Sequence, residues 1–278
     1  MKYKIIVDSC TDLTQEMKND QRIKSVPLTI QICDKTIVDD ETFEQKEFLR
    51  LVNESSETPK TACPSPDAYM QEMKGEEDVF VVTLSGNLSG SYNSALIAKE
   101  MYIEQWGHKN IEVINSCSAS IGQTLIANKL IKLIDKGLEF NEIVEKIQEF
   151  RANMKTKFVL QDVSTLAKNG RLTKIQSILV SVLNIKPILA GTKDGHIEKL
   201  GQARGFQKAL KELVKYIEAD AINAKEKILG IAHCNNYEKA MELKDMILEK
   251  INFKDYLIVD TAGISSTYAN NGGIIVSY

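Results

Sequence analysis

In the first half of this chain, short apolar runs rich in β-branched residues alternate with longer amphipathic runs. The short runs are typical of strands and the longer runs of helices. The predicted strands are residues 3–7, 26–32, 79–84 and 111–114. The predicted helices are residues 42–52, 91–103, 121–136 and 141–154, and Thr42 and Gln45 have the spacing of a capping box. This alternation predicts an α/β fold with a parallel sheet covered by helices.

The second half has a different pattern. A polar turn at residues 168–174 precedes a helical run at 175–183, and residues 185–190 and 196–200 flank the hairpin signal Lys193-Asp194-Gly195. The remaining predictions are helices at 206–219 and 237–251 and strands at 158–160, 228–233, 256–259 and 273–276. This order is α+β. No linker rich in Pro or Gly separates the halves, so we expect domains at residues 1–155 and 156–278 with a broad interface.

Composition excludes several classes of protein. A net charge of −3 over 278 residues does not indicate a nucleic-acid groove. The five cysteines are scattered without a C-x-x-C pair and the three histidines are widely separated, so we expect no disulfide framework, no metal and a reduced, cytoplasmic setting. No apolar run has the length of a transmembrane helix, so any membrane contact is expected to be peripheral and transient.

The sequence SGNLSGSYNS at residues 85–94 follows a predicted strand and opens a predicted helix. Gly86 and Gly90 allow close backbone approach, and Ser89 and Ser91 supply hydroxyls beside the positive end of the helix. An anion site and a simple helix cap are both compatible with this loop.

A second loop, TPKTACPSPD at residues 58–67, places Ser65 and Pro66 as the cap and first residue of a helix. That local structure leaves Thr61 and Cys63 unexplained.

Taken together, eight segments resemble the DegV family of bacterial fatty-acid-binding proteins. They cover nearly the whole chain in one order: VDSCTDL (7–13), VPLTI (26–30), TACPSP (61–66), SGNLSGSYNSA (85–95), VINSCSASIGQ (113–123), KNGRLTK (168–174), LNIKPIL (183–189) and ARGFQKAL (203–210).

The resemblance implies two α/β domains with a long-chain fatty acid buried between them and no other cofactor. Its carboxylate would be held by Thr61 and Ser89, beside Gly90. The family also includes the binding subunit of bacterial fatty acid kinase, which presents the acyl group to an ATP-using subunit. Arg171 and Arg204 correspond to family arginines, and we expect them to contact the phosphate or the kinase.

One position departs from the family pattern. The family usually ends with an H-x-G-x-G segment, whereas this chain reads STYANNGG at residues 266–273, with Thr267 in place of the histidine. A threonine donates a hydroxyl but carries no charge near neutral pH. We therefore expect Thr267 to be the third contact of the carboxylate, in a network that differs from that of the family.

Two other functions remain open on sequence. A hydrolase or acyltransferase would use Ser89 as nucleophile and His233 as base, although no spacing guarantees that they meet. A sensor of small anions would use the glycine loop alone. A fatty acid carrier needs instead a dry channel with a few convergent donors.

Overall fold

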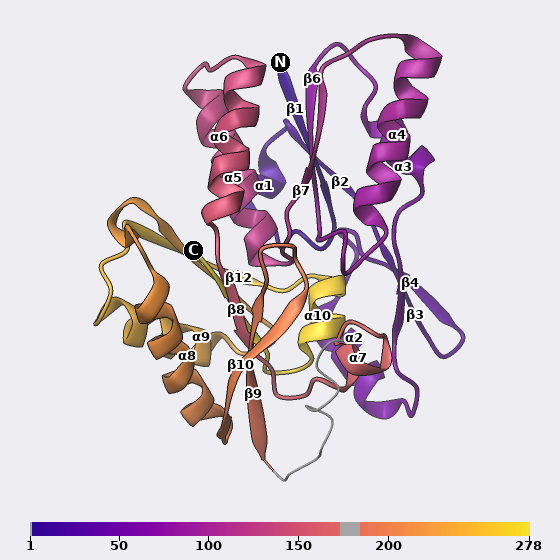
Figure 1. Ribbon diagram of the computed structural model, residues 1–278. Helices are drawn as coiled ribbons and strands as arrows, with labels where there is room; N and C mark the ends of the chain where they lie inside the picture. The colour runs from indigo at the N-terminus through magenta and orange to yellow at the C-terminus, as the bar shows by residue number, and fades with distance from the viewer. Residues whose placement is uncertain (1, 173–183) are drawn as a thin grey trace.

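A computed structural model describes residues 2–172 and 184–278 (Figure 1). Its first sheet has four parallel strands in the order β2-β1-β6-β7. The strands are β1 (Tyr3–Asp8), β2 (Ile23–Val26), β6 (Asp78–Thr83) and β7 (Ile111–Asn115). β1, β6 and β7 are rich in β-branched residues and are largely buried, as parallel strands between helices usually are, whereas the edge strand β2 exposes Lys24 and Ser25.

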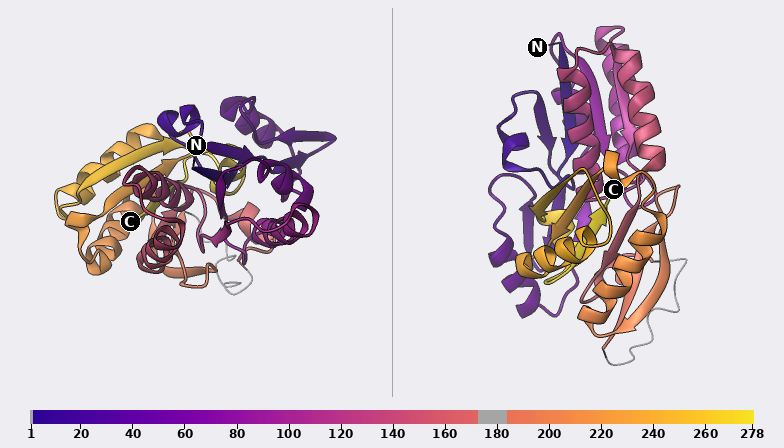
Figure 2. Two further views of the ribbon diagram at one scale, coloured as in Figure 1. Left: turned by 90° about the horizontal axis from the view of Figure 1, so that it is seen from above. Right: turned by 90° about the vertical axis from the view of Figure 1, so that its left-hand side faces the viewer.

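Helices cover both faces of this parallel sheet (Figures 1 and 2). One face packs against α5 (Ile121–Asp135) and α6 (Phe140–Asn153) through an apolar cluster that includes Phe80 and Ile126. The other face packs against α3 (Pro66–Glu72) and α4 (Ser91–Trp106), where Tyr69 and Val81 are buried. The short helix α1 (Gln15–Asn19) follows β1. These layers confirm the predicted helix-covered parallel sheet.

The predicted strand at residues 26–32 is wrong as a single element. It is divided between β2 and β3 (Thr29–Ile32), which belong to different sheets. Pro27 stands between them and has no backbone N–H for a sheet ladder, so one strand cannot continue through it. β3 is instead the centre of an antiparallel sheet between β4 (Lys35–Val38) and β5 (Lys60–Ala62).

The second half of the chain forms a six-stranded mixed sheet in the order β10-β9-β8-β13-β11-β12. Its strands are β8 (Thr156–Val159), β9 (Ile185–Gly191), β10 (Ile197–Arg204), β11 (Ile228–His233), β12 (Asp255–Asp260) and β13 (Ile274–Ser277). The antiparallel pairing of β9 with β10 confirms the predicted hairpin. One face is covered by α8 (Phe206–Asp220) and α9 (Tyr237–Leu248), and the short 3-10 helix η2 (Ala224–Glu226) precedes β11.

Three short helices lie where the two halves meet: α2 (Gln45–Glu54), α7 (Ser164–Lys168) and α10 (Gly263–Ala269) (Figure 1). Helix α10 packs against α2, α7 and β3, although it belongs to the last part of the chain. The predicted capping box at Thr42 is wrong, because Thr42 bonds to Asp40 and the helix begins at Gln45. The helix predicted at residues 175–183 lies outside the described residues.

The α/β architecture is therefore as predicted, while the division at residues 155 and 156 stays a prediction. Helix α5 packs on the parallel sheet and also against β11 and β13 of the six-stranded sheet. Across the described part of the chain, no helix is long and apolar enough to cross a membrane.

The contact between α5 and β11 depends on Gly230. A Cβ atom at this position would lie 2.6 Å from Cγ1 of Ile121. We predict that Gly230→Ala lowers the free energy of unfolding by about 1–3 kcal/mol, as overpacking of a core does, measured by urea denaturation.

Gly191→Ala is the matched control, because a Cβ atom on this strand glycine would meet no described neighbour closer than 3.8 Å. Equal destabilisation by both substitutions would contradict the prediction.

Candidate functional site

A cavity lies between the carboxyl ends of the parallel strands and one face of the six-stranded sheet. Its empty volume is about 850 Å³, the solvent at its mouth included. Its walls are mainly apolar, with side chains from both halves of the chain: Leu28, Leu84, Phe158, Ile197, Ile264 and Ile275. The carboxyl end of a parallel sheet is the usual place for a ligand in an α/β fold.

The cavity runs along strand β8. Alternate side chains point to opposite faces of a strand, so Thr156, Phe158 and Leu160 line the cavity while Lys157 and Val159 face the other way. The stretch from Thr156 to Leu160 spans roughly 13 Å at the rise of a β-strand. The cavity is therefore an elongated channel.

The Leu160 end of the channel carries a polar cluster. The Thr61 hydroxyl lies 2.8 Å from the Tyr268 hydroxyl, and the Arg171 guanidinium lies over the Tyr268 ring at 5.6 Å from its centroid. Nε of Arg171 donates to the Leu88 carbonyl at 3.1 Å, which brings the guanidinium beside Ser89. Thr61, Ser89, Arg171 and Tyr268 all line the cavity.

Residues 85–91 do not form a cradle of unpaired amides. Within the loop, the amides of Gly86, Asn87, Leu88, Ser89 and Ser91 already donate to protein acceptors. The hydroxyl of Ser89 accepts from the Ser91 amide at 3.2 Å, so its proton remains for another acceptor. This loop therefore offers a hydroxyl to a ligand, while the amides of these five residues are already paired.

Asp8 fixes the position of this loop. Its buried carboxylate at the end of β1 accepts from the Leu84 amide and from the Ser91 hydroxyl, both at 2.7 Å. Nε2 of Gln123 donates to the same carboxylate at 2.8 Å. Asp8 thus fixes both ends of the loop at residues 85–91 through Leu84 and Ser91, and it does not line the cavity.

Three of the predicted site residues do not line the cavity. The Thr267 hydroxyl donates to the Gly263 carbonyl at 2.8 Å, and this buried side chain does not line the cavity. Its neighbour Tyr268 reaches the cluster instead. Gly90 is the exposed N-cap residue of α4, and Arg204 is exposed at the end of β10.

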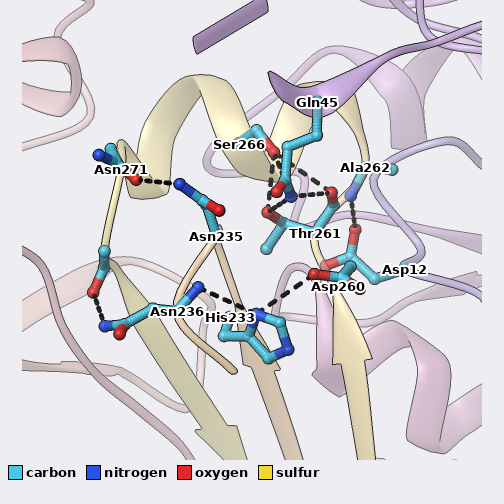
Figure 3. Close-up of polar contacts among 11 residues, drawn as sticks. Asp12, Gln45, His233, Asn235, Asn236, Asp260, Thr261, Ala262, Ser266 and Asn271 are labelled. Carbon is cyan, nitrogen blue, oxygen red and sulfur yellow. Dashed lines mark hydrogen bonds and ion pairs between the residues drawn. The ribbon is translucent and has the colours of Figure 1, made fainter. Parts of the chain in front are cut away.

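Helix α10, which carries Tyr268, is anchored by two buried carboxylates of the first half. Asp12 accepts from the Ala262 amide at 2.7 Å (Figure 3). Asp39 accepts from the amides of Gly263 and Ile264 at 2.6 and 2.9 Å. These acceptors meet the unpaired amides at the start of the helix.

Gln45 adds a third anchor. Its side chain extends from α2, and Nε2 donates to the Thr261 carbonyl at 2.8 Å and to the hydroxyls of Thr261 and Ser266 at 3.0 and 3.3 Å (Figure 3). The position of Tyr268 therefore depends on side chains more than 200 residues earlier in the chain.

The anchoring carboxyls are poorly solvated. Burial raises the pKa of Asp12 to about 7 and the pKa of Asp39 to about 6, although hydrogen bonds to each carboxylate oppose the shift. Burial also raises the pKa of Asp8.

His233 does not meet Ser89. Nδ1 of His233 lies 3.3 Å from the Asn236 amide and 3.3 Å from Asp260, and the imidazole is not part of the cavity wall (Figure 3). Burial lowers the pKa of His233. The structure therefore does not place His233 as a base for Ser89. In residues 2–172 and 184–278, no group of three or more His, Cys, Asp or Glu side chains could hold a metal ion.

Two important residues were missed on sequence. Tyr268 directly follows Thr267, the residue that was expected to contact the carboxylate. In a helix the side chains of successive residues point about a quarter-turn apart, so only one of the two can face the cavity. Asp39 stands in a polar stretch after a short strand, and no local pattern distinguishes it from a solvated turn residue.

Comparison with known proteins finds relatives over the whole length of this chain. Residues 2–278 match the model of the family described as "Uncharacterised protein, DegV family". A DegV domain-containing protein of Streptococcus pneumoniae is 38% identical over 284 residues, covering 100% of this chain and 99% of that protein.

Two solved structures have the same fold. A DegV family protein from Ruminococcus gnavus, refined with vaccenic acid, is 48% identical with a TM-score of 0.97, covering 100% of this chain and 99% of the other. The fatty acid kinase B3 protein of S. pneumoniae, loaded with linoleic acid, is 36% identical with a TM-score of 0.92 and the same coverage.

The raised pKa of Asp12 predicts how stability depends on pH. Between about pH 4 and pH 7 the folded protein retains a proton on Asp12 that the unfolded chain loses, so stability falls as pH rises. Asp12→Asn cannot ionise and keeps an acceptor for the Ala262 amide, so its stability is expected to fall less steeply over this range. Urea denaturation midpoints from pH 4.5 to 8 measure the slope.

The raised pKa values of Asp8 and Asp39 also make stability fall as pH rises, and the lowered pKa of His233 acts in the opposite direction. The contribution of Asp12 is therefore taken from the difference in slope between the wild type and Asp12→Asn. Asp34→Asn, at an exposed turn, is the control and should follow the wild type. A slope in Asp12→Asn equal to that of the wild type would refute the assignment.

Proposed function

The chain belongs to the DegV family, and on that premise we propose that it binds a long-chain fatty acid in the channel along β8. The observation that carries this proposal is the channel itself, whose walls are mainly apolar and which has hydroxyls and a guanidinium gathered near Leu160. Similar proteins from R. gnavus and S. pneumoniae hold vaccenic and linoleic acid.

The acyl tail supplies most of the affinity. Burial of a methylene contributes about 0.8 kcal/mol, so a sixteen-carbon chain contributes on the order of 10 kcal/mol before ordering costs. A small polar anion would gain nothing from these walls, which favours a lipid over the anion-sensor alternative. Because His233 is not beside Ser89, the hydrolase alternative lacks its base, which favours binding over catalysis by this chain.

The head group lies against Thr61, Ser89 and Tyr268. A carboxylate accepts hydrogen bonds but donates none, and each of these hydroxyls is a donor. In the Thr61–Tyr268 contact one hydroxyl donates to the other, which leaves one proton of the pair for the ligand. The nearby Arg171 guanidinium offsets the negative charge. Tyr268 thus takes the role that was expected of Thr267.

We further propose that the bound carboxylate is presented to the ATP-using subunit of a fatty acid kinase in the cytoplasm, with loading through transient contact with a membrane surface. The 36% identity to the fatty acid kinase B3 protein supports the kinase partnership. Arg171 lies at the head-group end of the channel, and the exposed Arg204 is available to a partner protein.

Removal of the head-group hydroxyls tests the binding mode. We predict that Thr61→Val, Ser89→Ala and Tyr268→Phe each weaken fatty acid binding by about tenfold to a hundredfold. Ser89→Ala removes a donor to the charged group, and loss of either hydroxyl of the Thr61–Tyr268 pair removes the donor itself or the hydroxyl that orients it. Titration of the delipidated protein with a fluorescent fatty acid measures the affinity.

Thr36→Val is the matched control, because β4 and β5 flank β3 on opposite sides and Thr36 is exposed away from the cavity. If the Thr61→Val and Ser89→Ala double variant is folded and binds as tightly as the wild type, the head group does not lie there.

Substitution of Arg204 distinguishes fatty acid binding from presentation of the bound acid to the kinase. We predict that Arg204→Ala leaves fatty acid affinity unchanged and lowers acyl phosphorylation by a fatty acid kinase ATP-binding subunit by about tenfold or more, because a charged contact with the partner is lost. The measurement is the rate of phosphate transfer to the bound acid, at a concentration of the loaded protein that limits that rate.

Lys211→Ala, on the exposed side of α8, is the charge-matched control. The kinase subunit should phosphorylate the acid bound to this variant at the wild-type rate. Unchanged phosphorylation in Arg204→Ala would remove Arg204 from the kinase contact.

A further inference from the structure

A second pocket adjoins the channel at the Thr156 end, opposite the head group. Its empty volume is about 750 Å³, open solvent included. Cys117, Thr156 and Gly191 line both this pocket and the channel. None of the residues assigned to fatty acid binding or to the kinase contact lines it.

The walls of this pocket are cationic. Arg151 comes from the last turn of α6, Lys155 from the connection to β8, and Lys193 from the turn between β9 and β10. No Asp or Glu side chain is among its described lining residues, and none of the three cations forms an ion pair within the described part of the chain. In a protein of net charge −3, three cations without an ion-pair partner in the described residues, from residues 151–155 and from the turn at Lys193, form a local positive region.

The donors of this pocket are only partly used. The half-buried Arg151 guanidinium contacts the Asn115 carbonyl at 3.5 Å and Sγ of Cys117 at 3.2 Å, both through Nη1. Its Nε and Nη2 atoms make no hydrogen bond to residues 2–172 or 184–278. The Thr192 hydroxyl accepts from the His196 amide at 3.1 Å, so its own proton remains for an acceptor.

We propose that this pocket binds a phosphate-type oxyanion, supplied either as a free phosphate or as the phosphate of an anionic lipid headgroup. A guanidinium with two unused nitrogens matches the spacing of two phosphate oxygens, and lysines add charge without demanding one geometry. Three cations without acidic partners suit a group that carries more than one negative charge. The bound phosphate would contact none of Thr61, Ser89, Arg171 and Tyr268, because none of them lines this pocket.

Titration with inorganic phosphate, at ionic strength held constant with chloride, tests the site by calorimetry. We expect saturable binding at one site per chain that Arg151→Gln and Lys193→Gln each weaken by about tenfold or more. Lys193 makes no described side-chain hydrogen bond, so Lys193→Gln tests the pocket even if Arg151→Gln disturbs the end of α6. A double variant, Lys18→Gln with Lys211→Gln, removes two exposed charges elsewhere and should bind phosphate normally.

A second arm identifies the source of the phosphate. Sedimentation with phosphatidylglycerol vesicles, against phosphatidylcholine vesicles as the neutral control, compares the wild type with the Arg151→Gln and Lys193→Gln double variant. Loss of phosphatidylglycerol binding in the variant, without saturable binding of inorganic phosphate, assigns the pocket to a lipid headgroup. Saturable phosphate binding with unchanged sedimentation assigns it to a free phosphate.

The proposal is overturned if neither probe distinguishes the wild type from the double variant, or if the Lys18 and Lys211 control loses as much binding. Fatty acid affinity is measured on the same samples. The three cations do not line the head-group end, so the fatty acid affinity of the double variant should equal that of the wild type. This measurement separates failure of the phosphate proposal from failure of the fatty acid assignment.

Discussion

Two carboxylates of the first half, Asp12 and Asp39, hold the first amides of a helix that belongs to the last twenty residues of the chain. The geometry of the channel depends on this contact, because that helix carries Ile264 into the wall and Tyr268 to the polar cluster. Removing a carboxylate from water is costly, and a buried carboxylate is tolerated when several donors converge on it. The anchoring of α10 is therefore specific, and its free energy depends on the protonation state of the carboxyls.

The arrangement of elements could be predicted from local patterns wherever one periodicity dominated. The parallel strands β1, β6 and β7 are short apolar stretches rich in β-branched residues, and Ser65 with Pro66 begins α3 as expected. Prediction failed where one residue changed the outcome. Pro27 ends a ladder within an apolar stretch, and Gln45 donates to Thr261, a residue over 200 positions away, instead of completing a capping box.

For the candidate site, the sequence pointed to loops that the fold brings to one cavity, and their role in binding stays a prediction. Thr61, Ser89 and Arg171 line one cavity, as the resemblance led us to expect. Thr267 was assigned by its place in a motif, but its hydroxyl is used inside α10. The direction of a side chain from a seven-residue helix depends on how that helix is anchored, and the anchors lie in distant parts of the chain.

The alternation along β8 has a consequence for which acids fit. Thr156, at the far end of the channel, shares a hydroxyl contact of 2.7 Å with Ser118 and another of 2.8 Å with Ser277. A methylene that lies against Phe158 gains the full benefit of burial, whereas one that reaches these hydroxyls gains little and separates them from their partners. For the proposed fatty acid ligand, the channel therefore acts as a ruler: the distance from the head-group cluster to the hydroxyls around Thr156 limits the length of acyl chain that is buried among apolar side chains.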